Sequence, residues 1–97
     1  MARRIARLVS VSEPKIIKRL NERGEERELI TKEVEVHSGA DRWVATAFEN
    51  VCKKMDELRV NATTIYEVDL SFKVATTTRD GETRKFNRVT LENIWEL

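Results

Sequence analysis

The sequence is poor in the residues that build disulfides, metal sites and phosphate loops. It holds one cysteine, one histidine and three glycines among 97 residues. A single cysteine, Cys52, excludes an internal disulfide framework and a Cys-x-x-Cys metal module, and it is typical of a reducing cytosol. No apolar run approaches the ~20 residues of a membrane span, and no signal-type run follows the N-terminal arginines. We therefore expect a cytoplasmic protein without cofactor, metal or membrane partner.

The sequence also lacks an excess of charge of one sign. The 18 Lys and Arg residues nearly balance the 17 Asp and Glu residues, although 36% of the chain is charged. No global basic field indicates nucleic acid, so such a partner requires a local patch. The length fits one domain over residues 1–97. Residues 1–20 are locally basic, with Glu13 against six cations: Arg3, Arg4, Arg7, Lys15, Lys18 and Arg19.

The clearest local signal is a C-terminal hairpin. Asp80-Gly81 fits a two-residue type I′ turn, which needs positive φ at both central residues. Strands are predicted over about 64–78 and 82–93. With Arg79 opposite Glu82, the apolar face pairs Phe72 with Val89 and Leu70 with Leu91, and the other face pairs Lys73 with Arg88, Ala75 with Phe86, and Thr77 with Arg84.

Upstream segments predict one helix and further strands. Apolar residues recur at spacings of three and four in the predicted helix: Phe48, Val51, Cys52, Met55 and Leu58. Segments 5–11, 30–36 and 43–47 are typical of strands. Residues 12–23 fit either a helix capped by Ser12 or, as we favour, a strand that turns at Arg23-Gly24 and pairs Ile17 with Ile30 and Arg19 with Glu28.

With the hairpin, the order becomes three strands, a helix and two strands. This is an all-β architecture with one helix, the order of the OB-fold, a five-stranded Greek-key barrel that binds oligonucleotides and oligosaccharides. A helix over residues 13–23 instead predicts an α+β sandwich.

Three stretches resemble the bacterial and phage single-stranded DNA-binding protein family: 41–48 with its tryptophan, 60–66, and 80–86 followed by 89–94. The resemblance implies an OB-fold protein that binds single-stranded DNA in replication or recombination, with homo-oligomers, commonly dimers or tetramers. It also implies that Trp43 stacks on a base. The sequence stops at Trp95-Glu96-Leu97, so we expect a bare domain without the acidic C-terminal tail of that family.

Non-specific binding of single strands needs cations along the phosphate path and flat side chains for the bases. The hairpin register places Phe86 with Lys73, Arg84 and Arg88 on one face. That face is a candidate nucleic-acid site. The alternative is that Phe86 covers a neighbouring apolar edge while the cations keep the hairpin soluble.

Further cations are candidates for extending the phosphate path. Arg7 and Lys18 belong to the basic N-terminal segment, and Lys32 can lay its stem along apolar surface with its charge near the groove. The alternative is an ordinary charged edge that prevents unwanted strand pairing.

No nucleophile with a paired base can be read from the spacing, so we expect a binder and not an enzyme. The leading hypothesis is a protein that coats single-stranded DNA. The alternatives are a primosome-type accessory protein that contacts replication proteins, and a protein-interaction or inhibitor module without nucleic-acid binding. Tyr66 and Trp95 are candidates for a subunit interface.

Overall fold

The computed structural model describes residues 2–97 and is dominated by one sheet. The elements in chain order are β1 (Ala2–Val11), β2 (Lys15–Leu20), β3 (Glu26–Ser38), β4 (Asp41–Phe48), α1 (Glu49–Leu58), β5 (Tyr66–Arg79) and β6 (Glu82–Glu96). The part of the chain that is described therefore has six strands, one more than the predicted five-stranded order, because β1 and β2 are separate strands. The predicted helix is confirmed but begins one residue later, after Phe48.

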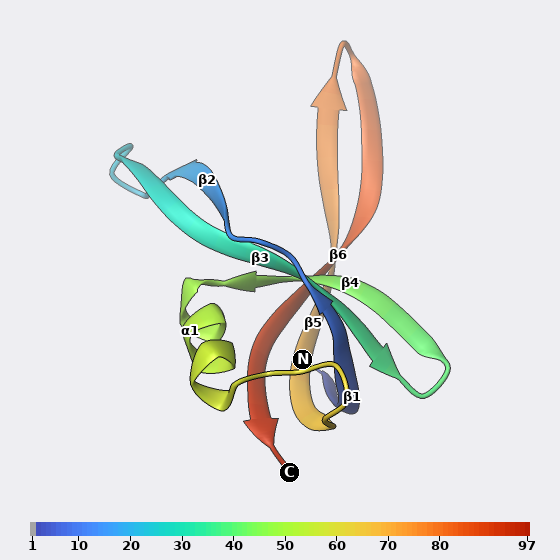
Figure 1. Ribbon diagram of the computed structural model, residues 1–97. Helices are drawn as coiled ribbons and strands as arrows, with labels where there is room; N and C mark the ends of the chain where they lie inside the picture. Colours follow the sequence, from blue (N-terminus) through green and yellow to red (C-terminus); the bar gives the residue numbers. More distant parts are fainter. Residues whose placement is uncertain (1) are drawn as a thin grey trace.

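The sheet closes in a ring. Its strand order is β1-β5-β6-β4-β3-β2, and β1 also pairs with β3. Five strands therefore form the ring, and β2 extends it along the outer part of β3 (Figure 1). Neighbouring strands are antiparallel except β4 and β6, which meet in parallel at Thr46 and Thr90.

The core fills the ring and lies against the helix. Residues of alternate positions on the strands are buried, together with Cys52 and Met55 of α1, which contacts β3, β4 and β6. The largest fully buried side chains are Tyr66, Leu8, Leu70, Leu91, Ile94, Val34, Val36 and Val68. Because one face of each ring strand packs inward, the other face is left to solvent.

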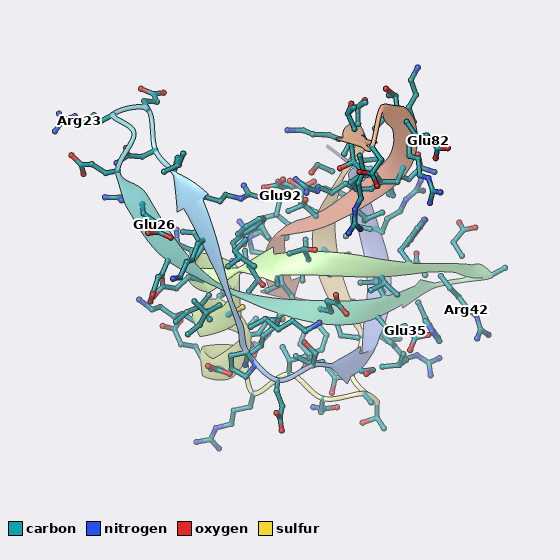
Figure 2. All side chains as sticks on the ribbon, turned by 90° about the horizontal axis from the view of Figure 1, so that it is seen from above. Arg23, Glu26, Glu35, Arg42, Glu82 and Glu92 are labelled. Atoms are coloured by element: carbon teal, nitrogen blue, oxygen red, sulfur yellow. The ribbon has the colours of Figure 1, made fainter. Side chains whose placement is uncertain are left out.

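Figure 1 shows the β2–β3 and β5–β6 hairpins extending beyond the ring as separate arms, with the β3–β4 turn projecting on another side. The β2–β3 arm comprises residues 15–31, and the β5–β6 arm comprises residues 72–89. Charged side chains surround both tips, which Arg23 and Glu82 mark in Figure 2. The arms are the parts of the sheet that have solvent access on both faces.

The β5–β6 arm confirms the predicted register. Arg79 lies opposite Glu82, and the pairing continues without a shift to Leu70 and Leu91, where a bulge follows. Asp80 and Gly81 have φ values of 52° and 78°, as a type I′ turn requires.

The β2–β3 arm corrects the prediction by one residue. Residues 15–20 are a strand and not a helix, but Ile17 pairs with Leu29 and Lys18 with Glu28, instead of Ile17 with Ile30 and Arg19 with Glu28. The turn is the reason: Asn21 Oδ1 accepts hydrogen bonds from the N–H groups of Arg23 and Glu25 at 2.9 Å, which centres the loop on residue 23.

A kink separates β1 from β2. Pro14 has no N–H to donate to a ladder, so one continuous strand is interrupted there. Ser12 keeps the kink attached to β3, because its N–H donates to Glu33 O and its hydroxyl accepts from Glu33 N–H, both at 2.8 Å.

Candidate nucleic-acid interface

A groove of about 220 Å³ lies where the two arms diverge from the ring. It is lined by side chains from four strands: Lys15, Ile17 and Arg19 of β2, Thr31 and Glu33 of β3, Thr46 and Phe48 of β4, and Arg88 of β6. Arg88 is the contribution of the β5–β6 arm, so the groove joins both arms.

Strand alternation explains why these side chains face the groove. Ala45 and Ala47 of β4 are fully buried, so Thr46 and Phe48 point to the opposite side. In β2, Lys15 and Arg19 share one face, and Lys18 points away from it. The small alanines allow the core to pack closely beneath the groove.

The groove carries more positive than negative charge. Lys15 Nζ lies 3.4 Å from Glu33 Oε1, the one carboxylate in the lining. The guanidinium of Arg19 lies 5.5 Å from the ring centroid of Phe48, within cation–π range. Within residues 2–97, no carboxylate oxygen lies within 4.0 Å of the cationic groups of Arg19 or Arg88. An anion entering the groove therefore meets two unneutralised guanidinium groups.

The groove-facing side of the β5–β6 arm continues this surface. Arg88, Phe86 and Arg84 alternate along β6, and Lys73 is paired with Arg88 on β5, as predicted. Phe86 is 45% exposed, so part of its ring is open to solvent. Arg84 lies 3.8 Å from Glu82, whereas Lys73 has no carboxylate within 4.0 Å in the described residues.

Trp43 does not belong to this surface. It shares the inner face of β4 with Ala45, is half-buried against the core, and meets Phe72 edge-on at 5.5 Å between ring centroids. Phe72 and Phe86 lie on opposite faces of the β5–β6 arm. Phe86 pairs with Ala75, which is three residues after Phe72, and side chains alternate between the two faces of a strand. Trp43 and Phe86 therefore lie on different surfaces, and the base-stacking role expected for Trp43 stays a prediction.

A second, more apolar hollow of about 300 Å³ lies on the Trp43 side of the arm. Its lining residues are Trp43, Phe72, Lys73, Val74, Asn87 and Val89. Lys73 borders this hollow although the register places it on the same face as Arg88. Val74 is 66% exposed, so this side of the arm presents apolar surface and few charges.

The three remaining predicted cations lie outside the groove. Lys32 is turned toward the helix, with Nζ 3.7 Å from Asp56 Oδ1 and only 17% of its side chain exposed. Lys18 lies on the far face of β2, 3.8 Å from Glu26. Arg7 is exposed on β1 opposite His37 and does not line the groove.

Sequence reasoning missed Phe48 as a groove residue. Its spacing of three to Val51 fits the helix pattern, which predicts a place within the helix. The structure makes it the last residue of β4 and the N-cap of α1. Strict alternation from Ala45 was the signal that could have placed it outside.

The remaining chemistry of the chain is modest. Burial raises the pKa of the Cys52 thiol, which donates to Ala47 O at 3.3 Å and stays protonated at neutral pH. Residues 2–97 contain no cluster of three or more potential metal-ligating His, Cys, Asp or Glu side chains. Among the same residues, α1 is too short to cross a membrane.

No protein-family model, no curated protein and no solved structure matches the chain.

Proposed function

We propose that the chain is an OB-fold protein that binds single-stranded nucleic acid, foremost DNA, in the groove between its two arms. The fold proposal rests on the ring. Without β2, the order is β1-β3-β4-β6-β5, with the helix between the third and fourth of these strands in chain order. The five-stranded OB-fold has this helix placement.

The observation that carries the functional proposal is the convergence of unneutralised cations and partly exposed rings on one surface. Arg19 and Arg88 reach the groove from different arms, with Phe48 between the strands and exposed Phe86 farther along β6. Cations neutralise phosphates, and aromatic faces stack bases at about 1 to 3 kcal/mol per base.

A single strand fits this surface better than a duplex. Stacking on Phe86 requires a base face that is free, and base pairs in a duplex are already stacked on their neighbours. The protein then acts by coating the strand, in replication or recombination, and it needs no catalytic group.

The second hollow favours one alternative function. Its apolar lining around Trp43 and Phe72 suits a hydrophobic side chain of a peptide better than a phosphate. A protein-interaction module would use this side of the arm, as would a primosome-type accessory protein that also contacts replication proteins.

The test is a fluorescence-anisotropy titration of a dye-labelled oligothymidylate with the whole chain, at low and high salt, beside a matched duplex. We use a labelled strand because Trp43 lies on the other face of the arm and is not expected to report on the groove. Binding of the single strand that weakens with salt, with weaker binding of the duplex, supports the proposal. No binding at low salt refutes it and favours the peptide alternative.

A further inference from the structure

One edge of the β5–β6 arm has no neighbour in the part of the chain that the structure describes. Within residues 2–97, β1 pairs with β5 from Tyr66 to Leu70, so in this part of the chain the edge of β5 has no partner strand from Phe72 to Arg79. An open edge presents unpaired N–H and C=O groups that can pair with another strand.

This edge lacks the features that normally prevent pairing. Its central residues 74–78 read Val-Ala-Thr-Thr-Thr, without charge, proline or glycine, and are mostly β-branched; the charged residues of this edge, Lys73 and Arg79, lie on either side of that stretch. The other open edges differ: β2 follows Pro14 and carries Lys15, Lys18 and Arg19, and the arm's part of β6 carries Arg84, Lys85 and Arg88. Within this hairpin, the β6 edge is charged and the centre of the β5 edge is not, which favours pairing of the β5 edge with another strand.

In the described residues, the arm has little packing beyond its own two strands. An isolated two-stranded hairpin is marginally stable in water, and a third strand or a packed face is usually required. Here the arm exposes 46% of Phe72 and 66% of Val74. Pairing at the β5 edge would convert the ribbon into a wider sheet.

We propose that the open edge of β5 pairs with the same edge of a second copy of the chain. The turn defines the register. Because Arg79 and Glu82 flank a two-residue turn, they form a hydrogen-bonded pair, so the N–H groups of Thr76 and its even-numbered neighbours point to the open edge. Two copies can then pair antiparallel about Ala75, with Val74 opposite the second copy's Thr76 and about eight hydrogen bonds between them.

Charge disfavours one of the neighbouring registers. A shift of two residues in one direction sets Lys73 opposite the second copy's Arg79, which is repulsive. Pairing about Ala75 instead sets Arg79 beside Ser71, whose hydroxyl donates to Glu92 Oε1 at 2.7 Å. Each Arg79 therefore meets a carboxylate of the other copy.

This dimer does not use Tyr66, which the sequence suggested as an interface residue. Tyr66 is only 2% exposed in the single chain and so cannot contact a second copy. The pairing does not depend on nucleic acid. It has a consequence for the proposed groove, however: directly opposite residues in an antiparallel sheet share a face, so Phe86 and Arg88 of both copies lie on one side of a four-stranded sheet.

The first test is the mass of the chain in solution without nucleic acid, measured by light scattering. We expect twice the 11.3 kDa of one chain at high micromolar concentration. Thr76→Pro removes an N–H from the open edge and leaves the β5–β6 ladder intact, so it should raise the dimer dissociation constant at least about tenfold. Lys85→Pro is the matched control, since Lys85 lies directly opposite Thr76 and its N–H points to the other edge.

The second test is a cross-link across the two-fold axis. Ala75→Cys places two thiols at a non-hydrogen-bonded pair, where Cβ atoms lie close enough for a disulfide, so oxidation should yield a covalent dimer. Lys73→Cys should not cross-link, because residue 73 faces residue 77 of the other copy, and native Cys52 is buried. A monomeric unaltered chain, a dimer that survives Thr76→Pro, or equal cross-linking by both cysteines would each overturn the proposal.

Discussion

Replacement of Arg88 with alanine should change the salt dependence of single-strand binding by a predictable amount. Three cations on the groove face have no carboxylate within 4.0 Å in the described residues: Arg19, Lys73 and Arg88. Lys15 and Arg84 already have carboxylate partners and release fewer counterions. With a slope of about −0.7 per neutralised phosphate of a single strand, three contacts predict a slope of about −2 in log K against log salt.

The magnitude follows from that slope. A fourfold rise in salt should weaken binding about 18-fold for the unaltered chain and about 7-fold for Arg88→Ala, whose slope falls by about 0.7. The assay is the anisotropy titration at several salt concentrations. Lys85→Ala is the matched control: it removes the same charge from the same strand, but Lys85 faces away from the groove.

Equal slopes for Arg88→Ala and the unaltered chain would refute the groove assignment. An equal decrease for Lys85→Ala would show that net charge, and not the groove face, determines binding. The same comparison applies to β2. Arg19→Ala should lower the slope, because Arg19 lines the groove, whereas Lys18→Ala should not, because Lys18 lies on the other face of the strand.

Phe86→Ala should weaken single-strand binding about 5- to 150-fold, the equivalent of one lost base stack, whereas Phe72→Ala, on the other face, should leave affinity unchanged in the same titration. Gly81→Ala should raise the hydrogen-exchange rates of amides in residues 72–89 about 5- to 30-fold, because alanine in the left-handed backbone at φ 78° destabilises the turn by about 1 to 2 kcal/mol. Unchanged rates would mean that another contact holds the turn. Cys52 should resist thiol reagents in the folded protein and react fully in denaturant, since burial raises its pKa and blocks access; rapid labelling without denaturant would contradict the packing of α1.

The β5–β6 arm could be predicted from local sequence alone. A type I′ turn at Asp80-Gly81 and strict alternation leave only one register, so the face shared by Phe86 and Arg88 could be predicted by counting. The helix was also predictable, because its buried positions repeat at spacings of three and four.

The aromatic residues that share a surface could be identified only from the closed sheet. The ring closes with Ala45 and Ala47 inside, so Phe48 points toward the groove and Trp43 toward the core. The local sequence pattern could not distinguish these outcomes, because Phe48 fits both the end of a strand and the start of a helix. Likewise, the side-chain hydrogen bonds of Asn21 shift the β2–β3 register by one residue. Because side chains alternate with a period of two, that single step replaces Lys18 with Arg19 in the groove.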